Sequence, residues 1–168
     1  LDPRYPVPQH ICEITNGLID QNVLHFDKSA NDDMTLTYHD SCNVARASSM
    51  GGIMGGQFTI PRKIIQTVAN NFYDMDDETI REKTYCCGGG GGLLTDDLME
   101  LRVKGALPRM EALKHLIEEK GVTHMAAICA ICKSQFSKVF QYYDLELDQI
   151  VSLHQLVSNA LIMNKKEV

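Results

Sequence analysis

The chain has 168 residues, a formal net charge of −6 and a pI of about 5.4, and 44% of its residues are hydrophobic. This length and composition fit one globular domain with an extra arm, which can bury a core without needing disulfides to stay folded. The acidic balance argues against binding to nucleic acid or to an anionic membrane face, because both require patches of Lys and Arg.

The N-terminal part predicts a lead-in followed by a helix and a strand. Residues 1–9 hold three of the five prolines and are expected to be extended. The apolar spacing over residues 10–22 predicts a helix, and Met-Thr-Leu-Thr-Tyr over residues 34–38 predicts a strand. We therefore divide the chain into an N-terminal lead-in and helix, residues 1–30, and a cysteine-rich domain, residues 31–168.

The middle of the chain predicts two helices separated by a short strand. Residues 61–70 are expected to be helical, with Pro61 at the first helical position, where its missing N–H does no harm. Residues 84–86 predict a second strand that runs into a glycine-rich stretch. Residues 93–120 are strongly helical in pattern, with Pro108 as a break or kink.

The C-terminal part continues the alternation of helices and strands. Gly121 is expected to cap the preceding helix, and residues 122–128 form the clearest buried strand. A helix over residues 132–142, a strand over residues 150–153 and a last helix to about Met163 follow. This alternation predicts an α/β fold with a parallel sheet flanked by helices.

Four cysteines come directly after predicted strands: Cys42, Cys86, Cys87 and Cys129. Because the carboxyl ends of parallel strands lie on one edge of a sheet, cysteines that are distant in sequence are expected to converge there. The sequence therefore predicts a cysteine site at the carboxyl edge of the strands.

The spacing of the cysteines indicates metal or redox chemistry. Cys129 and Cys132 form a C-x-x-C pair at a strand-to-helix turn, which fits a redox pair, half of a zinc site or half of a cluster site. The adjacent Cys86 and Cys87 reach different irons of one cluster more easily than they reach one zinc ion. Gly88–Gly92 carry no side chains, so the backbone can wrap closely around an inorganic core.

Five cysteines are one more than an ordinary site requires. Structural zinc takes four ligands and a four-iron cube takes four cysteines. With Cys42 the candidates number five, so one thiol is surplus to either site. The rival interpretations are packing of small hydrophobic side chains and a zinc site that uses four of the five. Cys12, on the first predicted helix, is expected to be a core residue.

These motifs resemble the cysteine-rich CCG domain of heterodisulfide reductases and related iron–sulfur oxidoreductases. The resemblance covers most of the chain and includes the residues that flank the cysteines. Within the family, these residues are most similar to heterodisulfide-reductase-like (DsrK-like) subunits of membrane-bound Dsr complexes. The segments that carry it are Tyr38-His39-Asp40-Ser41-Cys42-Asn43, Cys86-Cys87-Gly88-Gly89-Gly90-Gly91-Gly92-Leu93-Leu94 and Ala127-Ile128-Cys129-Ala130-Ile131-Cys132-Lys133.

The resemblance implies a catalytic iron–sulfur domain that reduces or forms a disulfide or trisulfide on a thiol partner, a DsrC-like small protein, in dissimilatory sulfur metabolism. It implies a 4Fe-4S cluster, with a noncubane form as one option, and electrons from the other subunits of a quinone-linked membrane complex. The implied ligands and catalytic residues are Cys42, Cys86, Cys87, Cys129 and Cys132.

The chain lacks an initiator Met, a signal peptide and a long apolar run, so we interpret it as a piece of a longer cytoplasmic protein that reaches the inner face of the membrane through partner subunits. The alternatives are a zinc-binding interaction module and an electron relay of a glycolate-oxidase-like or lactate-utilisation complex. His39 is a candidate ligand, proton donor or neighbour of the cluster, whereas Arg46 and Arg62 are expected to be solvated.

Overall fold

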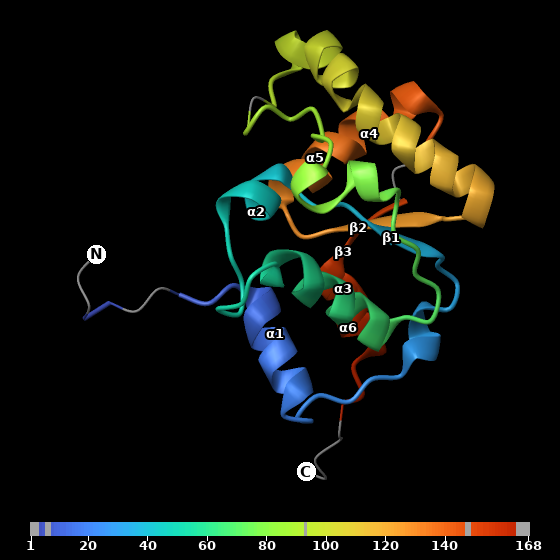
Figure 1. Cartoon of the computed structure of the whole chain (residues 1–168). Coiled ribbons are helices and arrows are strands. Elements are labelled where there is room, and N and C mark those ends of the chain that lie inside the picture. Colours follow the sequence, from blue (N-terminus) through green and yellow to red (C-terminus); the bar gives the residue numbers. More distant parts are fainter. Residues whose placement is uncertain (1–3, 6–7, 93, 147–148, 164–168) are drawn as a thin grey trace.

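A parallel three-stranded sheet forms the centre of the computed structural model, which describes residues 4–5, 8–92, 94–146 and 149–163 (Figure 1). The strands are β1 (Leu36–Tyr38), β2 (His124–Ala127) and β3 (Ile150–Ser152), in the spatial order β1-β2-β3. Tyr38 lies opposite Ala126 in the register between β1 and β2. The predicted α/β fold with a parallel sheet is confirmed.

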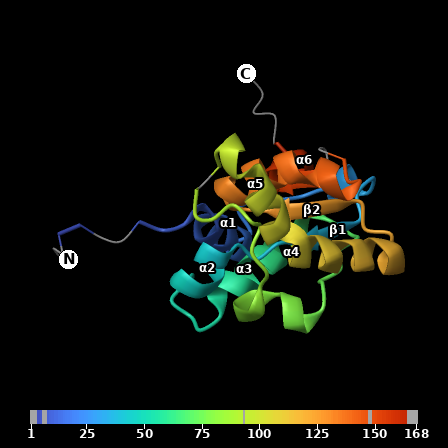
Figure 2. The same ribbon diagram turned by 90° about the horizontal axis from the view of Figure 1, so that it is seen from above.

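Helices cover both faces of the sheet. They are Ile11–Asp20 (α1), Cys42–Ala47 (α2), Gly56–Val68 (α3), Met99–Lys120 (α4), Ala130–Val139 (α5) and Leu153–Ala160 (α6). One face packs Leu36, Tyr38 and Ala126 against α1, α3 and α6, and the other packs Met125 against α4 and α5. Figure 2 shows the molecule from the face that α4 and α5 cover. Because neighbouring residues of β2 point to opposite faces, one short strand contributes to both cores.

The predicted strand over residues 84–86 is wrong. This stretch follows a 3₁₀ helix, Arg81–Lys83, and joins no sheet among the described residues. The Oγ1 of Thr84 donates to the carbonyl of Asp40 at 2.7 Å, and the guanidinium of Arg46 donates to the Thr84 carbonyl. Side chains therefore satisfy the polar groups that a sheet ladder would otherwise satisfy.

Both prolines that were expected to mark a helix start or break lie inside helices. The helix α3 begins at Gly56, so the prediction that Pro61 occupies its first position is wrong. Helix α4 continues through Pro108, so of the predicted break or kink the break does not occur, and the kink stays a prediction. Gly121 does cap α4: its φ is +65°, and its N–H donates to the carbonyl of Ile117 at 2.9 Å.

Several helix boundaries differ from the predicted ones. The predicted start of the long helix, Leu93, lies outside the described residues, and α4 itself begins at Met99 after a 3₁₀ turn, Asp96–Leu98. Helix α5 begins before Cys132 and ends at Val139, where a 3₁₀ helix takes over. Helix α6 ends at Ala160, short of Met163. Within the described ranges, no helix is both long and apolar enough to cross a membrane.

Candidate cysteine site

Three chain segments bring the five predicted cysteines to the carboxyl edge of the sheet. Cys42 is the first residue of α2, shortly after β1. Cys129 is the N-cap of α5, two residues after the end of β2, and Cys132 lies in the first turn of that helix. Cys86 and Cys87 come from the loop between the 3₁₀ helices and α4 rather than from a strand end. The cysteines converge as predicted, but Cys86 and Cys87 reach the site from a loop and not from the end of a strand.

Four of the thiols form a continuous line in space. Cys42 contacts Cys86, Cys86 contacts Cys87, and Cys87 contacts Cys132. None of the five is in a disulfide. Cys87 and Cys132 are only 3% and 2% exposed, Cys42 and Cys129 are half-buried, and Cys86 is exposed. The site therefore has a buried end at α5 and an open end at Cys86.

Cys86 and Cys87 are held in their protonated form when no metal is bound. The interaction with Cys132 is the largest effect on Cys87; Cys86 opposes it in part, burial adds to it, and the pKa of Cys87 is raised to about 12. The interaction with Cys87, followed by burial, raises the pKa of Cys86. Because thiolates are the form that binds metal, metal binding must release protons from this site.

The glycine run lies directly on the backbone of α4. Gly88 has a φ of +83°, and a Cβ built on it would lie 2.4 Å from the carbonyl oxygen of Arg102 and 2.7 Å from the amide nitrogen of Ala106. A Cβ on Gly105 would lie 3.3 Å from the Cα of Gly88. Glycine is therefore required at position 88 both for its conformation and for its closeness to the helix.

A buried ion pair anchors the segments that carry Cys42 and Cys86. The carboxylate of Asp40 accepts hydrogen bonds from both terminal nitrogens of Arg62, at 2.9 and 2.7 Å, and from the backbone N–H of Arg81 at 2.9 Å. Burial alone would lower the pKa of Arg62, but its hydrogen bonds to Asp40 and Asp74 more than offset this and raise it. The expectation that Arg62 is solvated is wrong, because it is 7% exposed.

A second buried cation lies near the cysteines without a carboxylate directly bonded to it among the described residues. Arg109 is fully buried and donates to Met75 Sδ, to the carbonyl of Thr79 and to Thr84 Oγ1. Burial lowers its pKa to about 10, which leaves it charged at neutral pH. Its charge interacts with Cys132. Neither Arg62 nor Arg109 has a local sequence signal, because their partners lie elsewhere in the chain.

His39 is buried beside this charge. Its backbone N–H donates to the carbonyl of Ala126 at 2.9 Å, which extends the pairing of β1 and β2, and its ring packs edge-on against Phe136. Burial, and then the charge of Arg109, lower its pKa well below the usual range. The imidazole is therefore neutral at physiological pH.

The donor set and the unpaired atoms around it fit an iron–sulfur cluster. Five buried atoms near the cysteine segments have no hydrogen-bond partner within the described residues: both ring nitrogens of His39, Ser41 Oγ, Arg102 Nη2 and Arg109 Nε. The two arginine nitrogens, the Ser41 hydroxyl and the one protonated ring nitrogen of neutral His39 are donors. Buried donors without partners are unfavourable, and inorganic sulfides and thiolates are acceptors for them. The described ranges contain no group of three or more His, Cys, Asp or Glu spaced to hold a single metal ion.

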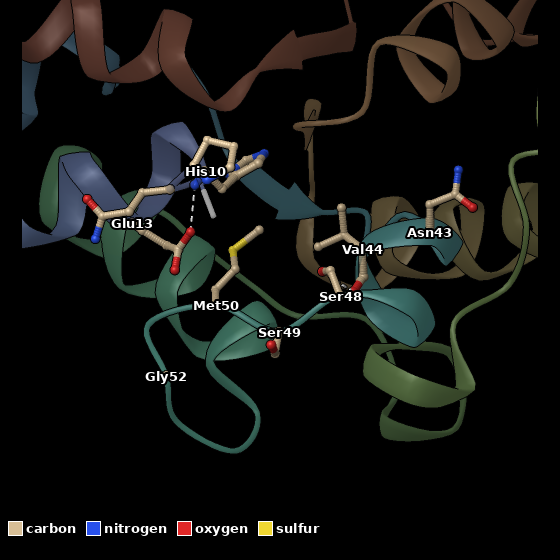
Figure 3. A pocket seen from close by; sticks show the side chains of 10 residues that line it. His10, Glu13, Asn43, Val44, Ser48, Ser49, Met50 and Gly52 are labelled. Atoms are coloured by element: carbon tan, nitrogen blue, oxygen red, sulfur yellow. Dashed lines mark hydrogen bonds between the residues drawn. The ribbon is translucent and has the colours of Figure 1, made fainter. Parts of the chain in front are cut away.

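A separate hollow lies beside the segment that carries Cys42, and the residues that line it include no cysteine. Its volume is about 730 Å³, and it lies between the start of α1, helix α2 and the loop after α2 (Figure 3). The Glu13 carboxylate accepts hydrogen bonds from the backbone N–H groups of His10 and Gly51, at 2.6 and 2.7 Å. Glu13 therefore fastens the loop after α2 to α1. Since no cysteine lines the hollow, it is separate from the thiols.

Comparison with known proteins gives consistent matches. Residues 36–137 match the family model of the CCG cysteine-rich domain. Two relatives are named Hdr-like menaquinol oxidoreductase iron-sulfur subunit 2, from Archaeoglobus fulgidus, and Hdr-like menaquinol oxidoreductase iron-sulfur subunit, from Archaeoglobus profundus. Each is 43% identical over 154 residues, which are 92% of this chain and 26% of the relative. The chain thus spans about a quarter of their length. No solved structure matches.

Proposed function

Because this chain belongs to the CCG cysteine-rich domain family, we propose that it is the catalytic iron–sulfur domain of a heterodisulfide-reductase-like oxidoreductase subunit. Its reaction would be the reduction or formation of a sulfur–sulfur bond on a thiol partner. The observation that carries the proposal is the line of contacting thiols from Cys42 through Cys86 and Cys87 to Cys132, with Cys129 one turn away.

We assign the five cysteines as ligands of a four-iron cluster, with the noncubane form as one option that the family resemblance implies. When bound, such a cluster supplies electrons singly, whereas cleavage of a disulfide to two thiols takes two electrons and two protons. The chain itself contributes the shape of the site: Cys87 and Cys132 are shielded from water, and Cys86 is open to it.

The buried charges of the chain fit an anionic group at this position. Several thiolates and sulfides carry net negative charge, and a buried charge needs compensation. Arg109 offers a fully buried positive charge that interacts with Cys132 and still has a free donor, Nε, within the described residues. Asp40 and Arg62 keep the Cys42 and Cys86 segments in place, so they act as positioning residues.

The whole protein's partners are also part of the proposal. We propose a DsrC-like small thiol protein as the substrate and quinone-linked membrane subunits as the electron source, in dissimilatory sulfur metabolism. The menaquinol oxidoreductase names of the two relatives support the second of these. The domain would then lie on the cytoplasmic side of the membrane, attached through those subunits.

Metal analysis tests the proposal. The chain is reconstituted anaerobically, and iron, acid-labile sulfide and zinc are counted for the wild type, for Cys87→Ser and for Cys12→Ser. Cys12 is fully buried in the other core, so its variant is a matched control. We expect about four irons with sulfide in the wild type and in Cys12→Ser, and loss of iron in Cys87→Ser. About one zinc without sulfide would refute the iron–sulfur assignment and support the zinc module.

The catalytic part of the proposal needs a second measurement. The EPR spectrum of the reconstituted chain is recorded before and after addition of a thiol. A shifted signal is expected if sulfur chemistry takes place at the cysteine site. A redox-active cluster whose signal is indifferent to thiols would support the electron relay instead.

A further inference from the structure

The five cysteines differ in their access to solvent, and this difference gives the site a direction. Among them, Cys86 is the exposed one, whereas Cys87 and Cys132 are almost fully covered. A pocket of about 250 Å³ opens beside Cys86. A molecule that comes from solvent therefore meets the sulfur of Cys86 first.

The pocket is built to admit a small, partly apolar group. Gly88, Gly90 and Gly105 contribute backbone without side chains, and Leu98 and Leu101 provide apolar surface. Arg102 completes the lining beside Cys86 and provides its one charged group among the described residues. Pockets for drug-sized ligands start at about 300 Å³, so this one suits a group of about the size of one amino-acid side chain with its backbone. A sulfur on a short methylene chain matches both the size and the apolar surface.

The pocket continues along α4 as two further hollows. One, of about 280 Å³, shares Leu98 and Leu101 with the first and also has Asp97, Glu100 and Lys104 in its lining. The other, of about 360 Å³, shares Glu100 and Lys104 with the second and reaches Tyr142. A ligand that fills all three would be extended, like a stretch of polypeptide. In the middle hollow, Lys104 donates to the Glu100 carboxylate at 2.6 Å, so these two charges compensate each other. The remaining carboxylate, Asp97, favours a basic residue in that stretch.

We propose that the pocket beside Cys86 receives a cysteine-borne sulfur from an extended polypeptide segment, whose neighbouring residues, one of them basic, lie along α4 over Leu98 and Leu101. This inference rests on the proposed function for its sulfur chemistry. It adds the side from which a protein-borne sulfur enters and the residues of this chain that contact it.

The leucines of α4 provide matched variants. Leu101 is 64% exposed and lines the pocket, and Leu107 is 43% exposed on the same helix outside all three hollows. Leu101→Ser and Leu107→Ser therefore make the same chemical change at solvent-exposed positions, without adding a charge that would attract a basic residue. Thermal unfolding of both variants checks that each remains folded.

Two readouts use these variants. The reconstituted chain is titrated with the capped peptide Gly-Lys-Cys-Gly, with Gly-Glu-Cys-Gly and with N-acetylcysteine amide, and the EPR shift gives an apparent Kd. The metal-free chain is mixed with each thiol as its mixed disulfide with thionitrobenzoate. The exchange is run at alkaline pH, because the pKa of Cys86 is raised and buffer must remove its proton. The Cys86 thiolate attacks the peptide sulfur, a new disulfide forms between them, and thionitrobenzoate is released; peptide mapping then identifies the modified cysteine.

We expect the lysine peptide to bind most tightly and to modify Cys86 first. Leu101→Ser should weaken its binding and slow the exchange by at least about tenfold, the effect of losing the leucine surface that the ligand would bury, while Leu107→Ser stays within about twofold. Equal behaviour of the two variants would overturn the pocket assignment. N-acetylcysteine amide that binds as well as the peptide would overturn the polypeptide substrate. A wild-type signal that no thiol shifts would instead refute the proposed function.

Discussion

Removal of the buried Asp40 carboxylate should lower the free energy of unfolding more than removal of any exposed charge. In Asp40→Ala, the buried Arg62 loses two charge-assisted hydrogen bonds and keeps its contact with Asp74, and the backbone N–H of Arg81 loses its acceptor. Breaking a buried pair from one side lowers the free energy of unfolding by about 3–5 kcal/mol. For a domain of this size, the melting temperature should fall by roughly 6–20 °C.

Asp74→Ala is the matched control, because it removes the other carboxylate from the same arginine. The Asp74 side chain is 28% exposed, against 2% for Asp40, so water replaces part of its interaction. We expect a loss of about 1 kcal/mol, or roughly 2–4 °C. Arg62 keeps both of its bonds to Asp40 in this variant.

Denaturant and thermal unfolding of the metal-free, reduced chain measure both effects without coupling to metal binding. If the two variants lose the same stability, or if Asp40→Ala loses less than about 1 kcal/mol, the inference that this pair is a buried anchor is wrong. Asp40→Ala should also retain less iron after reconstitution, because Asp40 holds the segments that carry Cys42 and Cys86.

Three further predictions test the glycine run, the buried arginine and the buried histidine. Gly88→Ala should lower the free energy of unfolding by about 2–5 kcal/mol through backbone strain and overlap with α4, whereas Gly91→Ala, with a φ of +71° but open space around it, should lose about 1–2 kcal/mol in urea unfolding. Arg109→Met should make the midpoint potential of the reconstituted cluster more negative, on the order of 60 mV, in an EPR-monitored titration, and Lys104→Met, at an exposed position of α4, should not. The pKa of His39 is depressed in the folded chain, so below about pH 6.5 the unfolded chain binds a proton there that the folded chain does not. The free energy of unfolding should therefore fall by up to about 1.4 kcal/mol per pH unit between pH 6.5 and the folded pKa. The same pH slope in His39→Gln would contradict this assignment.

Local patterns in the sequence were enough to predict the sheet and the cysteine site. Strands β1 and β2 are short runs whose residues are largely buried, and such runs stand out from their polar and glycine-rich surroundings. The C-x-x-C pair and the adjacent cysteines are likewise visible as spacing alone. Since strand ends in a parallel sheet share one edge, the convergence of Cys42 with Cys132 followed from the predicted topology.

The tertiary structure decided what the local patterns could not. The segment before Cys86 has the composition of a strand, but Asp40 and Arg46 satisfy its polar groups, so it approaches the site as a loop. An arginine in a helix pattern looks the same whether it is solvated or buried, because the carboxylate that permits burial lies far away in sequence. Asp40 and Arg62, 22 residues apart, meet only when β1 and α3 pack together. Likewise, which cysteine stays open to solvent depends on how α4 and α5 cover the others.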